Sequence, residues 1–171
     1  MLTKVLRSNL IRSLGLLFFQ VIILNEIHVH VPIIPYFYVL FIILMPFGIS
    51  PALSLILAFA LGLSVDMFSN TGAIHAAAAV LVAFVRPYTL KAMKPVMGYE
   101  DLVRPGMRKL GFSWFVMYSA LLIILHHFAL YFLEVFTFTE VLFTLSRIMG
   151  SSLITLFLVL IFEFLFQSKN N

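Results

Sequence analysis

The sequence contains no cysteine, which excludes disulfides, thiolate metal sites and cysteine nucleophiles together. Charged residues are also scarce, at 11%, whereas soluble domains carry about 25%. The chain is instead 63% hydrophobic with 19 phenylalanines, and its mean hydropathy is +1.11. A water-soluble core of this length could not take up so many apolar side chains without covering its surface with them. The composition therefore predicts an integral membrane protein.

Six apolar stretches are long enough to cross a bilayer as helices, which takes about 20 mostly apolar residues. They cover residues 8–25, 33–48, 51–68, 73–90, 111–133 and 141–166. Ser50 and Pro51 are a typical N-cap and first-turn pair, and Ser-Asn-Thr-Gly at 69–72 breaks a long apolar run. No connection is long enough to fold as a soluble domain. We therefore expect one all-helical domain over residues 1–171, a polytopic bundle of six transmembrane helices.

The first stretch resembles a secretory signal, because Lys4, Arg7 and Arg12 precede an apolar run. No small-x-small cleavage site follows that run, only Asn25 and the residues Glu-Ile-His after it. We therefore expect an uncleaved first span and not a removed peptide.

With six spans, every basic segment falls on the same side of the membrane. The connection 86–111 holds six of them: Arg86, Lys91, Lys94, Arg104, Arg108 and Lys109. Three more precede the first span, and Lys169 follows the last. No Lys or Arg occurs in the other connections, at 26–32, 69–72 and 134–140. Because Lys and Arg concentrate in cytoplasmic loops, six spans place both termini in the cytoplasm.

The basic connection 86–111 has two compatible interpretations. It can lie against anionic lipid headgroups, which contribute about 1 kcal/mol per basic residue near the surface. It can also be a docking site for a cytoplasmic partner. Its six basic residues outnumber its two acidic ones, Glu100 and Asp101, so either partner would be negatively charged.

Small residues recur every four positions in the third stretch, at Ser54, Ala58 and Gly62, and Asp66 continues the same face. In the fourth stretch His75, Ala79 and Ala83 form a matching face. Small residues at this spacing let two helix backbones approach closely in a membrane. We therefore expect these two helices to pack tightly against each other.

Asp66 and Arg147 are ionisable residues within predicted spans, and such residues are costly to bury and often functional. Both fall in the outer half of the bundle, so a mutual ion pair is the leading hypothesis. Alternative partners for Asp66 are His75, a backbone N–H at the start of the fourth span, or another subunit. The remaining alternative is that both residues are solvated separately near the outer interface.

The histidines give weak signals. Glu26, His28 and His30 alternate in an outer loop as metal ligands might, but so small a set is poor support and we expect no metal site. His126 and His127 lie in the outer part of the fifth stretch, where imidazole rings suit the membrane interface. We expect them to decorate the helix end.

Catalysis is not expected. Gly62-Leu63-Ser64 resembles the start of an intramembrane serine protease motif, but Val65 stands where the second glycine belongs. An intramembrane aspartyl protease needs two aspartates within spans, and only Asp66 is available. No glycine-rich phosphate-binding loop is present either. We therefore expect neither an enzyme nor a cofactor.

The pattern Gly62-x3-Asp66-x2-Ser69-x2-Gly72-x2-His75, followed by Arg-Pro at the end of the fourth stretch, resembles the signature hairpin of the rod shape-determining protein MreD family. The chain length, the six expected spans and the basic N-terminus are similar to that family over essentially the whole chain. Gly62, Asp66 and Gly72 are the family's most characteristic residues, whereas Ser69 and His75 match it less generally.

The resemblance implies a non-catalytic scaffold in the bacterial plasma (inner) membrane, part of the elongasome that directs peptidoglycan synthesis, cell-wall growth and cell shape. It also implies a fold like the substrate-binding subunit of energy-coupling-factor transporters. Implied partners are the single-span protein MreC, the RodA glycosyltransferase with its penicillin-binding transpeptidase, and MreB filaments indirectly. Anionic lipids are further expected partners, and nucleic acid is not.

The competing interpretation is a small-solute-binding or proton-coupled transporter component, with Asp66 and Arg147 as a relay or substrate clamp. A transporter lines its cavity with several polar groups. Beyond these two residues and the Ser and Thr side chains of the sixth stretch, the sequence shows few of them.

Because the chain has no cysteine of its own, introduced thiols report topology directly. We expect a membrane-impermeant thiol reagent added to intact cells to label Asn70→Cys and not Gly98→Cys. Labelling of position 98 from outside, with position 70 protected, would reverse the predicted orientation.

Overall fold

The computed structural model describes Gly15, Gln20 and residues 33–96, 98–99, 104–136 and 140–166. The described residues contain helices and connections, and no strand. The helices are α2 (Val39–Ile43), α3 (Pro51–Ser69), α4 (Ile74–Ala92), α5 (Met107–Leu110), α6 (Phe112–Val135) and α7 (Val141–Leu165). The expectation of an all-helical chain is confirmed for these residues. The first expected span, 8–25, falls almost entirely outside them.

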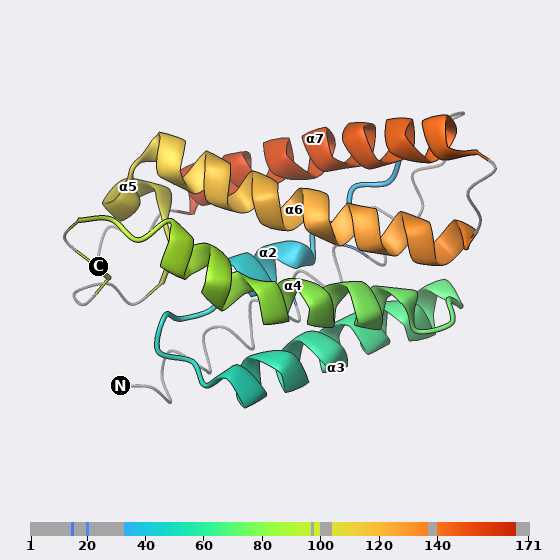
Figure 1. Ribbon diagram of the computed structural model, residues 1–171, viewed down its shortest axis with the longest axis horizontal. Helices are drawn as coiled ribbons and strands as arrows, with labels where there is room; N and C mark the ends of the chain where they lie inside the picture. The colour runs from blue at the N-terminus through green and yellow to red at the C-terminus, as the bar shows by residue number, and fades with distance from the viewer. Residues whose placement is uncertain are drawn as a thin grey trace.

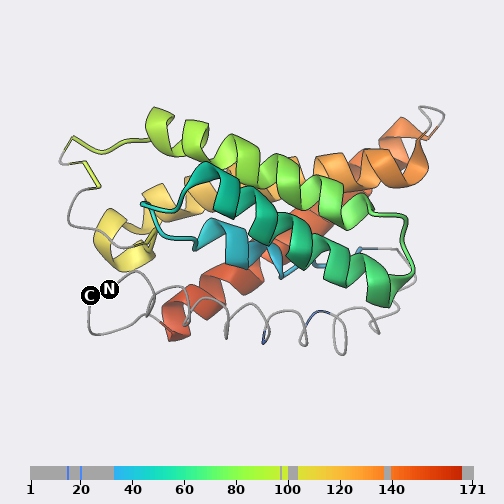
Figure 2. The ribbon, with the colours of Figure 1, turned by 90° about the horizontal axis from the view of Figure 1, so that it is seen from below.

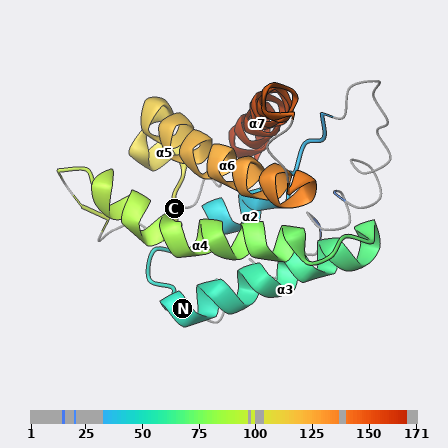
Figure 3. The same cartoon turned by 45° about the vertical axis from the view of Figure 1, so that its right-hand side comes forward.

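Two antiparallel helix pairs make up most of the described structure. The first pair is α3 with α4, the second is α6 with α7, and α4 packs against α6 to join them (Figure 1). The short helix α2 lies between the two pairs, in contact with α4 and α6 (Figure 3). The view from below shows α3 and α4 side by side along their length, with their turn at one end (Figure 2).

Local sequence explains where α3 begins and ends. The hydroxyl of Ser50 accepts a hydrogen bond from the backbone N–H of Leu53 at 3.3 Å, and Pro51 occupies the first turn, where its missing N–H costs nothing. At the other end Asn70 adopts a left-handed conformation, with φ of 54°. Asparagine tolerates that conformation better than most residues, so it closes the helix and starts the turn into α4.

Three helices are long and apolar enough to cross a membrane: α3, α6 and α7, of 19, 24 and 25 residues. The chain is therefore a multi-pass membrane protein. The helix α4 is as long as α3, but it carries Arg86 and Lys91 and is not among the three. The described residues thus support three candidate spans and not the six that we expected.

The expected span at 33–48 is wrong as a transmembrane helix. Its helical part is α2, five residues long, and residues 33–36 before it are not helical. Pro35 and Pro46 account for this, since each disfavours the helical conformation in the residue before it and cannot itself supply a helical N–H. Every residue from Tyr36 to Met45 is buried, so this segment faces the interior of the bundle and not lipid.

Side chains of the surrounding helices satisfy the non-helical backbone before α2. The N–H of Ile34 donates to the Ser151 hydroxyl at 3.1 Å, and the N–H of Tyr36 donates to the Thr155 hydroxyl at 3.1 Å. The N–H of Phe37 donates to the Gln20 side chain at 2.7 Å. Irregular backbone is tolerated at membrane depth only where protein groups take the place of water. The polar face of α7 therefore has a structural role, which is to hold this segment.

The small-residue faces of α3 and α4 are buried where the two helices meet. Ala58, Ala79 and Ala83 are at most 2% exposed, and Ser54 and Gly62 are buried on the same side of α3. The approach is closest at Gly62, where an added Cβ would lie 2.5 Å from the Cα of Ala76. No side chain fits there unless the two backbones separate.

We expect Gly62→Ala to lower the free energy of unfolding by about 1–3 kcal/mol, because the new methyl group would clash with α4 backbone. Thermal unfolding in mild detergent, followed by the fluorescence of Trp114, measures the effect. Gly72→Ala is the matched control: nothing lies within 4 Å of its added Cβ, so we expect a change within about 0.5 kcal/mol. Equal Tm values for the two variants would contradict the close approach of α3 and α4.

Candidate functional site

The candidate site is the turn between α3 and α4, where Asp66, Thr71, His75 and Ala76 form what we call the Asp66 cluster. One carboxylate oxygen of Asp66 accepts hydrogen bonds from the Thr71 hydroxyl at 2.6 Å and from the His75 N–H at 3.1 Å. The other oxygen accepts from the Ala76 N–H at 2.9 Å. The imidazole Nδ1 of His75 lies 2.9 Å from the carboxylate as well. Asp66 thus closes the hairpin by binding the start of α4 from the end of α3.

The start of a helix favours a carboxylate. The first N–H groups of α4 have no partner within the helix, and the aligned peptide dipoles place partial positive charge there. Asp66 is only 3% exposed, so these donors replace the water that the carboxylate loses on burial. Among the alternative partners for Asp66, the structure selects His75 and backbone N–H groups of the fourth helix.

The remaining motif residues, Ser69 and Gly72, are not among the donors to the Asp66 carboxylate named above. Ser69 is the last residue of α3, and Gly72 has open space around it. The left-handed positions of the turn are Asn70 and Ala73, with φ of 54° and 64°, and neither is a glycine. Gly72 therefore has no steric requirement that the described structure reveals.

The expected ion pair between Asp66 and Arg147 is wrong. The guanidinium of Arg147 instead lies 3.0 Å from a carboxylate oxygen of Glu134 and 4.3 Å over the ring of Tyr131. Arg147 is on α7 and both of these partners are on α6, so the pair belongs to the second helix hairpin. The Asp66 carboxylate already has its own donors in the first hairpin, which leaves no need for a distant cation.

A buried group of aromatic and imidazole rings adjoins the Asp66 cluster. The ring of Tyr36 has centroid distances of 5.1 Å to His75, 6.0 Å to His126 and 5.6 Å to His127. The hydroxyl of Tyr38 is 2.5 Å from Nε2 of His126. We call these five side chains the imidazole–tyrosine core. It brings the segment before α2 together with α4 and α6.

Placing His126 and His127 at the membrane interface was therefore wrong, since both are completely buried. Nδ1 of His127 contacts the carbonyl of Ile123 at 2.8 Å, and its Nε2 lies 3.2 Å from the Thr155 hydroxyl. Tyr36 and Tyr38 were not singled out at all. Their signal was available, because a tyrosine in an apolar stretch needs a partner for its hydroxyl.

Two imidazole nitrogens in the imidazole–tyrosine core are buried without a hydrogen-bond partner: Nε2 of His75 and Nδ1 of His126. Two hydroxyls in the described residues, those of Ser119 and Ser152, are also buried without a hydrogen-bond partner. More than about nine in ten buried polar groups in proteins are satisfied, so unsatisfied ones need an explanation such as a water or a small polar ligand.

Contrary to our expectation of a surface loop, two of the six basic residues in the connection 86–111 contact the inside of the bundle. Arg86 lies within α4 and is only 3% exposed; it donates to the Tyr118 hydroxyl at 2.9 Å and to the Met45 carbonyl. Arg104 pairs with the buried Glu163 of α7 at 3.2 Å. The other basic residues are exposed: Lys91 near the end of α4, Lys94 after it, and Arg108 and Lys109 in α5. Two of the six basic residues thus hold the bundle together.

Within the described ranges, no three His, Asp or Glu side chains converge as metal ligands. The loop with Glu26, His28 and His30 lies outside those ranges. The hydroxyl of Ser64, in the motif that resembles a protease, donates to the carbonyl of Ala60 at 2.7 Å, and Ser64 is half-buried. No family model, curated protein or solved structure matched the chain. The resemblance to the MreD family therefore stays a prediction.

We expect Asp66→Ala to lower the free energy of unfolding by about 2–4 kcal/mol, because it leaves the N–H groups of His75 and Ala76 buried without an acceptor. Thermal unfolding in detergent checks this. Glu140→Ala is the matched control, since that carboxylate is exposed and makes no capping bond at the start of α7. Equal destabilisation by the two substitutions would show that the Asp66 cluster does not hold the hairpin.

Proposed function

We propose that the chain is a non-catalytic membrane scaffold of the bacterial elongasome, with the role that its resemblance to the MreD family implies. One observation carries the proposal: the residues of the family motif build a hairpin and no reactive centre. Asp66 uses both carboxylate oxygens on donors of its own hairpin. Gly62 allows the two helices to touch. A motif made of packing and capping groups suits a protein that works by binding other proteins.

Helix association in lipid favours this interpretation. Lipid tails are as apolar as leucine, so helices associate through close packing and a few polar contacts. The small residues of α3 are used internally against α4. The opposite face of α3 exposes large side chains at Ile56, Phe59 and Met67, each at least half exposed. This outward face is available to a partner helix such as the single span of MreC.

We also propose the orientation and the partners that follow from the basic residues. The helix α5 and the C-terminal end of α4 lie at the end of the bundle opposite the α3–α4 turn (Figure 1). Lys94 follows α4 by two residues. The preference of Lys and Arg for the cytoplasmic side places that end in the cytoplasm, and with it the route to MreB. The Asp66 cluster then faces outward, on the side where RodA and its penicillin-binding transpeptidase build the wall.

A second candidate function has an observation of its own. The unpartnered nitrogens of His75 and His126 lie in one buried core, which suits a small polar solute or a transferable proton. This favours a transporter component and adds polar groups that the sequence did not show. A scaffold is expected to retain a protein partner, whereas a transporter component is expected to be stabilised by a small solute alone.

The test is co-purification with MreC in mild detergent. We expect the full chain to retain co-expressed MreC and to lose an MreC variant whose span is replaced by a polyleucine helix, because specific packing is required. Loss of wild-type MreC as well, together with a rise in Tm on adding small solutes without any partner, would contradict the scaffold and support a transporter.

A further inference from the structure

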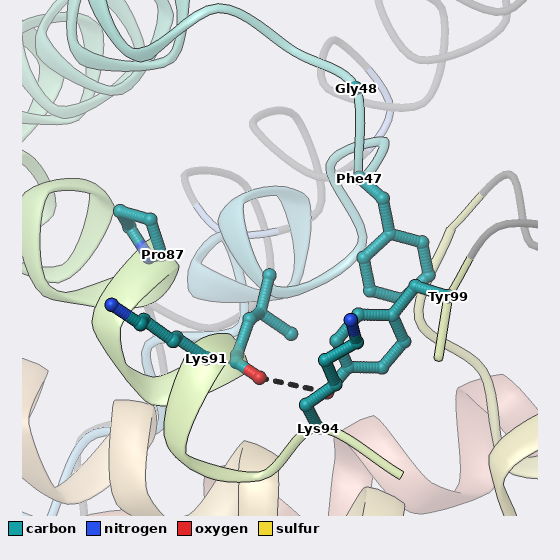
Figure 4. A pocket seen from close by; sticks show the side chains of 7 residues that line it. Phe47, Gly48, Pro87, Lys91, Lys94 and Tyr99 are labelled. Carbon is teal, nitrogen blue, oxygen red and sulfur yellow. Dashed lines mark hydrogen bonds between the residues drawn. The ribbon is translucent and has the colours of Figure 1, made fainter. Parts of the chain in front are cut away.

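A cavity of about 610 Å³ opens at the end of the bundle opposite the Asp66 cluster. Phe47 and Gly48 come from the connection after α2, Pro87 and Leu90 from α4, and Tyr99 from the chain beyond it. Lys91 and Lys94 also line it, and none of the described residues that line it is acidic. Figure 4 shows Lys94 beside the rings of Phe47 and Tyr99, and Lys91 nearer to Pro87. The volume is within the range of about 300–1,000 Å³ that ligand sites occupy.

The walls of the cavity are fixed by contacts of their own. The rings of Phe47 and Tyr99 stack at a centroid distance of 4.4 Å and an interplanar angle of 15°. The Tyr99 hydroxyl donates to the Leu90 carbonyl at 2.9 Å (Figure 4). The indole N–H of Trp114 donates to the Met93 carbonyl at 2.8 Å. Two carbonyl groups near the C-terminal end of α4 thus accept hydrogen bonds. They reduce the partial negative charge of the helix end, which would otherwise repel an anion.

The two lysines of the cavity have no ion-pair partner among the described residues. The ion pairs of the described residues join His75 to Asp66, Arg104 to Glu163 and Arg147 to Glu134, and none includes a cation of the cavity. Arg86, one turn before Leu90 on α4, is buried with only neutral acceptors in the described structure. A buried cation without an opposite charge is costly, so a nearby anion would stabilise it.

The same end of α4 has the features of a membrane interface. Tyr88 and Phe84 are 62% and 53% exposed, and their rings lie 5.6 Å apart on the outward face of the helix. Tyr88 is one turn before the end of α4 and close in sequence to Lys91, whereas Phe84 lies nearer the middle of the helix. Aromatic rings beside lysines at a helix end are typical of the headgroup level of a bilayer. Clusters of Lys and Arg next to the cytoplasmic end of a membrane helix bind anionic headgroups. The cytoplasmic position of this end rests on the orientation proposed above.

We infer that this cavity binds the phosphate group of an anionic phospholipid, with Lys91 and Lys94 contacting the phosphate oxygens. The stacked rings of Phe47 and Tyr99 pack against the glycerol of the headgroup, and the acyl chains lie over Tyr88 and Phe84. The site is independent of the scaffold role, because it rests on the opposite end of the bundle.

The test measures lipid binding to the purified, delipidated full chain in mild detergent by native mass spectrometry. We expect phosphatidylglycerol to bind more tightly than phosphatidylcholine, and Lys91→Ala/Lys94→Ala to weaken that binding about 30-fold. The matched control is Arg108→Ala/Lys109→Ala, which removes two exposed charges of α5 outside the cavity and should retain full binding. Lys91→Arg/Lys94→Arg keeps both charges and should bind as the wild type does.

Three results would overturn the site. Equal weakening by the control pair would mean that net charge alone attracts the lipid. Equal binding of the two lipids would exclude recognition of the anionic headgroup. Competition by millimolar inorganic phosphate as effective as that by phosphatidylglycerol would assign the cavity to free phosphate and not to a lipid.

Discussion

The structure depends on one constraint, which is that backbone polar groups within a membrane must find partners in the protein. Residues 33–36, before α2, are not helical, so their N–H groups lack the partners that a helix supplies. Ser151 and Thr155 on α7 accept two of them, and Tyr118 on α6 donates to the Ile43 carbonyl on the far side of α2. From the first pair, Arg86 of α4 donates to the Met45 carbonyl just after α2. The segment between the two helix pairs therefore joins them in addition to the direct contact of α4 with α6.

The two ends of the bundle solve different electrostatic problems. At the α3–α4 turn, a carboxylate is surrounded by donors and its charge is well accommodated. At the opposite end, Arg86 has a hydroxyl and a carbonyl as acceptors, and lysines line the neighbouring cavity. The Asp66 carboxylate finds its donors within its own hairpin, whereas Arg86 and the two lysines have no carboxylate partner among the described residues. The carboxylate and these cations thus lie toward opposite ends of the long axis of the bundle.

Hydrophobic pattern and turn chemistry predicted α3, α4, α6 and α7 to within a few residues, because long apolar runs bounded by Ser-Pro or Ser-Asn-Thr-Gly leave few alternatives. The segment 33–48 was misread, since an apolar run buried in protein has the same composition as one buried in lipid. The partner of Arg147 was missed because Glu134 was assigned to a loop, whereas α6 extends to Val135 and carries it into the second hairpin. The buried position of His126 and His127 depends on Tyr36 and Tyr38, which are distant in sequence. No periodicity within one helix could reveal such a contact.

The burial of α2 has a consequence for biogenesis. The Ser151 hydroxyl that holds Ile34 is 117 residues further along the chain, so most of the protein must be synthesised before the segment has its acceptors. A five-residue helix is not stable in lipid while the backbone N–H groups before it lack hydrogen-bond acceptors. The nascent segment must therefore be sheltered, in the insertion machinery or at the water boundary, until α6 and α7 arrive.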